Sequence, residues 1–153
     1  MFDTLAIVQA RVASQRLPGK VLKMIGVQPL IEVLLGRLSE SKRIDKIVVA
    51  TTERTEDDRL AKTVEGLGYS IFRGSEDDVL GRFYHAALFF GSKTIVRITG
   101  DCPLIDADLV DRVIELYQKN DVEYASNVHP PSFPDGLDVE VFSISVLEEA
   151  YEN

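Results

Sequence analysis

Cysteine, histidine and tryptophan are scarce in this sequence of 153 residues, which has one cysteine, two histidines and no tryptophan. A single cysteine cannot form an internal disulfide, and so few cysteines and histidines exclude an ordinary structural zinc site. No apolar run reaches the ~18 residues that a membrane span needs, and the N-terminus lacks the features of a signal peptide. We therefore expect a cytoplasmic protein with one hydrophobic core.

Positive charge is also in short supply, because 17 Lys+Arg stand against 25 Asp+Glu and leave a formal net charge of −8. This balance argues against general nucleic-acid binding and against a polybasic membrane surface. Residues 4–31 are the exception, since they contain no acidic residue but include Arg11, Arg16, Lys20 and Lys23. A cationic island in an acidic protein predicts a site for a small anion, with solvated surface charges as the alternative.

Short apolar runs alternate with segments of helical spacing along the chain. Strands are predicted at residues 5–8, 46–51, 69–72, 94–98, 122–125 and 137–142. Helices are predicted at residues 29–38, 55–67, 75–90, 106–118 and 143–151, with Thr55 as one N-cap and Asp106 as another. The alternation predicts an α/β fold with a mainly parallel sheet and helices on both faces. Ligands of such sheets bind beyond the carboxyl ends of the strands.

The loop after the first strand carries the cations together with Ser14 and a Pro-Gly turn at residues 18–19. A strand-to-helix loop offers positive side chains and free backbone N–H groups, which a triphosphate needs. The pattern is neither the P-loop sequence nor the glycine pattern of dinucleotide-binding folds.

Asp101 follows Gly100 directly after the strand at residues 94–98. A carboxylate in this position is well placed to hold a hard divalent cation such as Mg²⁺, although Gly-Asp pairs also mark turns. Asp106 and Asp108 precede a helical stretch, so we interpret them as cap and first-turn residues.

Asp138 and Glu140 alternate with apolar residues in the segment PDGLDVEVF at residues 134–142. This alternation fits a strand with one polar face, which either binds sugar hydroxyls or a metal or is simply solvated. The two histidines suggest no catalytic arrangement. Cys102 is expected to be a small buried residue.

Four segments together resemble the cytidylyltransferase family of sugar-activating enzymes, which includes the synthetases of CMP-KDO and CMP-sialic acid. ARVASQRLPGKVL at residues 10–22 matches the N-terminal signature of the family at every fixed position. FRGSEDDVLGRFYHAA, RITGDCPLID and PDGLDVEVF extend the resemblance to the SpsF-like group of spore coat polysaccharide biosynthesis. The resemblance covers nearly the whole chain.

This resemblance implies a nucleotide-diphospho-sugar transferase fold and transfer of CMP from CTP to a sugar or sugar acid, with release of pyrophosphate. It implies that Arg11 and Lys20 grip the phosphates of CTP, while Ser14 and Arg16 shape the loop. It also implies that the backbone around Ala10 meets the cytosine.

The resemblance further implies that Asp101 is a ligand of Mg²⁺, and it places Asp138 and Glu140 at the sugar end of the site. Thr99 departs from the glutamine that KDO-type synthetases carry, so different acceptor contacts are expected. Members usually continue beyond this length, so we expect residues 1–153 to form a single nucleotidyltransferase domain without the C-terminal part and its second acidic metal ligand.

Two alternatives stay open, namely a nucleotide-binding module without turnover and a transferase that uses another nucleoside triphosphate. Leu34-Leu35 and Phe89-Phe90 are candidate apolar surfaces for a homodimer.

Overall fold

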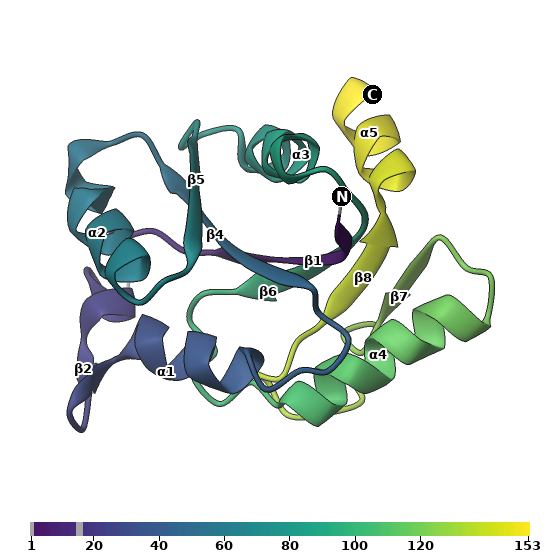
Figure 1. The fold of residues 1–153 in the computed structure, drawn as a ribbon, viewed down its shortest axis with the longest axis horizontal. Coiled ribbons are helices and arrows are strands. Elements are labelled where there is room, and N and C mark those ends of the chain that lie inside the picture. Colours follow the sequence, from purple (N-terminus) through teal and green to yellow (C-terminus); the bar gives the residue numbers. More distant parts are fainter. Residues whose placement is uncertain (1, 15–16) are drawn as a thin grey trace.

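Strand β1 (Phe2–Gln9) lies at the centre of the molecule in this computed structural model, which describes residues 2–14 and 17–153 (Figure 1). Its residues from Leu5 to Val8 are apolar and fully buried, so the strand is covered on both faces. It pairs in parallel with β4 (Lys46–Thr52) on one side and with β6 (Ser92–Thr99) on the other.

The sheet has six strands in the order β5-β4-β1-β6-β8-β7. β5 (Ser70–Gly74) continues the parallel part beside β4. β8 (Glu140–Ser143) is antiparallel to β6, and β7 (Tyr124–Ser126) is antiparallel to β8 at the edge. The expected mainly parallel sheet is confirmed.

Helices cover both faces of the sheet, as expected (Figure 1). One face packs against α1 (Leu30–Leu38), α2 (Asp58–Gly66) and α4 (Ala107–Lys119). The other face packs against α3 (Val79–Phe90) and α5 (Ile144–Glu152). Alternate residues of β1 enter the two cores, with Ala6 and Val8 on the first face and Leu5 and Ile7 on the second.

The strand order creates a switch point between β1 and β6. From β1 the chain moves outward through β4 to β5, and then returns to the other side of β1 as β6. The carboxyl ends of β1 and β6 lie side by side there, with Gln9 opposite Thr99. Ligands of open α/β sheets bind in the crevice at such a point.

Several predicted boundaries are wrong, although the elements themselves exist. The helix expected from Ser75 begins at Val79, because the Asp78 carboxylate accepts the N–H of Gly81 and takes the cap position. Thr55 is not an N-cap, since a 3-10 turn, η2 (Thr55–Asp57), precedes α2. The strand expected at residues 137–142 starts only at Glu140, which leaves Asp138 in the preceding loop.

The sequence patterns also missed three short elements between β1 and α1. These are the 3-10 turn η1 (Lys20–Leu22) and the strands β2 (Met24–Ile25) and β3 (Gln28–Pro29) of a small hairpin.

Leu34 and Leu35 are fully buried, so the expectation that they offer an exposed surface is wrong. Phe89, by contrast, is 74% exposed on α3. Among the described helices, none has the length and apolarity to cross a membrane.

Candidate functional site

The cationic loop leaves β1 at the switch point and folds back against β4. Ala10 donates its N–H to the carbonyl of Ala50 over 3.1 Å, and Gly19 donates to the carbonyl of Val12 over 2.9 Å. These bonds keep Arg11 and Lys20 close to the carboxyl end of the sheet. Arg16, which the sequence also places in this loop, lies outside the described residues.

Asp57 fixes the first part of the loop. Its carboxylate accepts the N–H of Val12 over 2.7 Å, and it also accepts the hydroxyl of Thr52. The residue is only 2% exposed. Sequence reasoning gave Asp57 no role in the site, because nothing in the sequence distinguishes it from its acidic neighbours Glu56 and Asp58.

Gly100 brings the end of β6 against the end of β1. Its N–H donates to the carbonyl of Gln9 over 2.7 Å. A Cβ atom at position 100 would lie 2.6 Å from that carbonyl oxygen and 2.7 Å from the Cβ of Ala10, which is closer than side chains tolerate. Glycine is therefore required for the two loops to meet.

Lys20 and Asp101 form an ion pair across this junction, 81 residues apart in sequence. Burial raises the pKa of the Asp101 carboxyl, but the Lys20 ammonium and the Thr99 hydroxyl outweigh that effect and hold its pKa below the ordinary value. The sequence predicted both residues at the site, and the structure brings them together. The pairing itself was not predicted.

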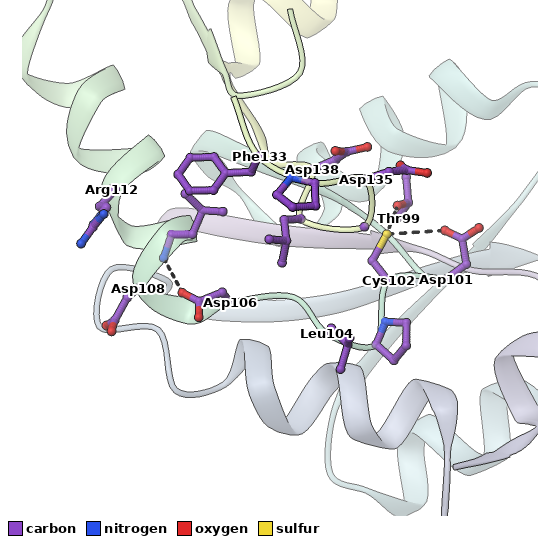
Figure 2. Close-up of a pocket in the computed structure, with 15 residues that line it drawn as sticks. Thr99, Asp101, Cys102, Leu104, Asp106, Asp108, Arg112, Phe133, Asp135 and Asp138 are labelled. Carbon is purple, nitrogen blue, oxygen red and sulfur yellow. Dashed lines mark hydrogen bonds between the residues drawn. The ribbon is translucent and has the colours of Figure 1, made fainter. Parts of the chain in front are cut away.

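Two cavities open on either side of Asp101. The smaller one, of about 590 Å³, is lined by the cationic loop, including Ala10, Arg11, Ser14 and Lys20. The larger one, of about 1020 Å³, lies between the start of α4 and the loop before β8 (Figure 2). Thr99 and Asp101 line both cavities, so this short segment is their common wall.

A chain of charges extends from the smaller cavity toward α3. Arg11 lies 3.5 Å from the Glu76 carboxylate, which also pairs with Arg54. Arg82 is 2% exposed, and its Nε and Nη2 atoms have no partner in the described structure. Burial, together with the nearby Arg11 charge, lowers the pKa of Arg82. Sequence reasoning missed Glu76 and Arg82, since both lie within ordinary helical patterns.

Asp138 and Glu140 are separated by the structure. Asp138 lines the larger cavity. Glu140 instead pairs with Arg97, accepts the Tyr124 hydroxyl over 2.8 Å, and faces an apolar cavity between α3 and α5. The expectation that both carboxylates share one face of a strand is therefore wrong.

The other residues considered in the sequence take structural positions. Asp106 caps α4, as predicted, by accepting the N–H of Leu109 over 2.8 Å. Cys102 is buried, as predicted, with its thiol 3.0 Å from the Thr99 hydroxyl (Figure 2). His85 lies on the surface beside Tyr151.

Asp101 fits a magnesium ion that is shared with a ligand, but not a cage made of protein groups alone. Within residues 2–14 and 17–153, no three acidic, histidine or cysteine side chains are grouped closely enough to hold a metal together. Mg²⁺ ordinarily takes one or two protein carboxylates and completes its shell with phosphate oxygens and water. An ionised Asp101 between two cavities meets that requirement.

Comparison with known proteins relates this arrangement to one family. A family model described as cytidylyltransferase matches residues 5–148. The chain is 44% identical to a protein of Methanocaldococcus jannaschii, over 97% of this chain and 60% of the relative. It is 35% identical to the spore coat polysaccharide biosynthesis protein SpsF of Bacillus subtilis, over 99% of this chain and 68% of the relative.

A solved structure agrees with these matches. A cytidylyltransferase from Leptospira borgpetersenii superimposes with a TM-score of 0.93 at 36% identity, and the match covers 99% of this chain and 65% of that one. The chain thus spans about 60–68% of the length of these three relatives. Since the family model covers nearly all of it and the fold agrees, the chain belongs to the cytidylyltransferase family.

Proposed function

We propose that this chain carries the nucleotidyl-transfer site of an enzyme that moves CMP from CTP to a sugar or sugar acid and releases pyrophosphate. The observation that carries the proposal is that the two cavities share a wall at Thr99 and Asp101. Close to this wall, the described cationic side chains line the smaller cavity and not the larger one. CTP would occupy the smaller cavity and the acceptor the larger one. The name of the Bacillus subtilis relative supports a role in the synthesis of a surface polysaccharide.

The proposed reaction needs no protein nucleophile. An acceptor hydroxyl in the larger cavity attacks the α-phosphorus of CTP in line, and a bond forms between that oxygen and phosphorus. The bond from the α-phosphorus to the oxygen bridging to the β-phosphorus breaks, pyrophosphate leaves with its electron pair, and the hydroxyl proton passes to solvent. Catalysis then depends on positioning and on electrostatic stabilisation.

Lys20 and Arg11 supply positive charge on the side from which pyrophosphate departs. Lys20 would exchange its ion pair with Asp101 for contacts with phosphate oxygens, and Arg11 would do the same with respect to Glu76. Charged donors that already face the developing charge need little reorganisation during the reaction.

Mg²⁺ fits the carboxylate of Asp101 and would offset negative charge on the phosphate oxygens when bound. The low pKa of Asp101 keeps this carboxylate ionised at neutral pH, as metal binding requires. Asp101 at the common wall would then orient the α-phosphate toward the larger cavity.

Replacing Lys20 tests this proposal. We expect Lys20→Ala to lower kcat/KM for pyrophosphate release from CTP by about 100- to 1,000-fold, the range found when one charge-stabilising donor is removed. Lys23→Ala is the matched control, because Lys23 lies in the same acid-free stretch but is exposed. Circular dichroism verifies that both variants stay folded. Equal activity of the two variants would refute the assignment of Lys20.

A nucleotide-binding module without turnover is the second candidate. It is favoured by the lining of the smaller cavity, because Arg11 and Lys20 could hold a triphosphate without any reaction following. Calorimetry with CTP and Mg²⁺, run beside a pyrophosphate-release assay, separates the two candidates, because heat without product indicates the module. Thermal shifts with the four nucleoside triphosphates decide the base.

A further inference from the structure

We propose that Arg97 is a further substrate-binding residue, whose guanidinium holds the α-phosphate of CTP. The inference rests on the proposed function, and it adds a cation that comes from β6 and not from the loop after β1. Arg97 lines the smaller cavity together with Arg11 and Lys20. Its place on the strand and the partners of its guanidinium lead to this assignment.

The place of Arg97 on β6 brings it close to the proposed reacting bond. Ile95 of this strand packs in the core with α3 and α5, whereas Val96 and Ile98 enter the opposite core. Since side chains alternate along a strand, Arg97 and Thr99 lie on the face of Ile95, ~6.6 Å apart along the strand. Thr99 belongs to the wall shared by the two cavities, where the proposed reaction puts the α-phosphorus. An arginine side chain is long enough to cover this distance.

One part of the Arg97 guanidinium is already held. Its Nη1 atom donates to the Oε2 atom of Glu140, which lies opposite Arg97 on β8. The Tyr124 hydroxyl donates to the other carboxylate oxygen, Oε1, over 2.8 Å, so Glu140 is itself fixed. The guanidinium carbon also lies 5.8 Å from the centre of the Phe83 ring, within the range of a cation–π contact. Glu140, which the sequence placed at the sugar end, therefore belongs to the site through Arg97.

The remaining donors of Arg97 are free to bind a ligand. Nε and Nη2 have no hydrogen-bond partner within residues 2–14 and 17–153, and the side chain is 37% exposed. These two N–H groups form a fork that can bind two oxygens of one phosphate. Arg97 also lines the apolar cavity between α3 and α5, where the other described polar groups are Glu140 and Tyr124. A new anionic partner for the fork therefore comes from the smaller cavity, when CTP occupies it.

An arginine in this position suits the charge distribution of the proposed reaction. The non-bridging oxygens of the α-phosphate carry negative charge while the bond to pyrophosphate breaks. Lys20 and Arg11 face the departing pyrophosphate, so Arg97 is the cation that stays with the CMP group. Binding of CMP should therefore depend on Arg97 and much less on Lys20.

Calorimetry with CMP and CTP separates these roles. With Mg²⁺ and no acceptor, we expect Arg97→Met to raise the Kd of both nucleotides by about 10- to 100-fold, the loss typical of a hydrogen bond to a charged group. Lys20→Ala should raise the Kd of CTP far more than that of CMP. Arg43→Met is the matched control, because Arg43 also pairs with a glutamate and has a 38% exposed side chain, but precedes the amino end of β4. It should leave both Kd values unchanged.

Two further variants keep the test decisive if Arg97→Met alone does not fold. In Arg97→Met/Glu140→Gln no unpaired acid remains on β8, and the methionine still packs on Phe83. Arg97→Lys keeps a positive charge but loses the fork, so it should also bind CMP more weakly than the unmodified chain. If folded Arg97 variants bind CMP as tightly as the unmodified chain, or if only CTP binding weakens, the assignment is overturned.

A direct measurement applies if the unmodified chain binds neither nucleotide, a result that counts against the proposed function. NMR follows the Nε–H signal of Arg97, which is identified by its loss in Arg97→Met. We expect millimolar inorganic phosphate to shift this signal and to leave that of Arg43 in place. The assignment is overturned by no shift, by equal shifts of the two signals, or by a shift with gluconate but not with phosphate, which would assign the fork to a carboxylate.

Discussion

A methyl group at position 100 would collide with atoms that cannot move away, because the nearest ones are the carbonyl oxygen of Gln9 and the Cβ of Ala10. We expect Gly100→Ala to lower the free energy of unfolding by about 1–3 kcal/mol, the usual cost of overpacking. Urea denaturation measures this change. The loops after β1 and β6 should also separate, so CTP binding should weaken more than stability alone explains.

Gly36→Ala is the matched control for this prediction. Gly36 lies within α1 and is exposed, and a Cβ atom there would meet no described residue within 4 Å beyond its chain neighbours and the backbone of the helix. Alanine there should stabilise the protein by about 0.5–1 kcal/mol, because it improves helix propensity. If Gly100→Ala is as stable as Gly36→Ala, the close approach of the two loops is incorrect.

The Lys20–Asp101 pair also predicts a pH dependence. Since the pKa of Asp101 is lower in the folded than in the unfolded chain, its contribution to stability is present above the unfolded value and is lost as the pH falls through the folded value. In Lys20→Met the effect of burial should dominate, so the pKa of Asp101 should rise. Carbon-detected NMR titration of the carboxylate measures the shift, and Lys23→Met should leave it unchanged.

At the scale of the elements, every long strand and helix could be predicted from periodicity, whereas several of their ends could not. Ser75 and Asp78 are both good cap residues, and only the tertiary structure places the Asp78 carboxylate on the N–H of Gly81. Asp138 continues an alternating pattern into β8, yet the strand begins two residues later. Local patterns do not contain the contacts that decide between such neighbours.

The sequence predicted those residues of the candidate site that directly follow the ends of buried strands. The loop with Arg11 and Lys20 and the segment with Asp101 both follow buried strands, and parallel strands place their carboxyl ends at one edge. Asp57 and Arg82 were missed because their roles depend on burial, which arises from packing between elements distant in the sequence.

The Asp57 carboxylate connects η2 to the loop after β1 and to the end of β4, so replacing it should lower the stability of the protein. Asp57→Ala would leave the partly buried N–H of Val12 and the buried hydroxyl of Thr52 without their acceptor. We expect a loss of about 2–4 kcal/mol in the free energy of unfolding, by thermal or urea denaturation. Hydrogen exchange at the Val12 amide should accelerate as well.

Glu56→Ala is the control at the neighbouring position, because the Glu56 side chain is 57% exposed and pairs with the exposed Arg54. Its effect should stay within about 0.5 kcal/mol. Similar losses in the two variants would contradict the structural role of Asp57.

At the scale of the whole molecule, the switch point explains how an acidic protein accommodates an anion. The chain carries a formal charge of −8, yet Arg11 and Lys20 of the acid-free stretch lie beside the carboxyl ends of β1 and β6. Asp101, from the other side of the switch point, forms an ion pair with Lys20. The site is therefore balanced internally, and a ligand has to replace both partners of the ion pair.

This internal balance predicts that CTP and Mg²⁺ each strengthen the binding of the other. CTP alone would draw Lys20 away and leave the Asp101 carboxylate beside the phosphates, while Mg²⁺ alone would leave Lys20 facing a cation. CTP and Mg²⁺ together supply a partner to each group, and at 100 times the Kd they should add ~2.7 kcal/mol of stability. For a chain of this size, that corresponds to a rise in Tm of roughly 5–10 °C, against little change with either ligand alone.

Asp101→Asn should remove the dependence of CTP binding on Mg²⁺. It should also strengthen binding of CTP in EDTA, because Lys20 is then free to contact the phosphates. If CTP binds the unmodified chain equally well with and without Mg²⁺, then Asp101 does not link the two ligands.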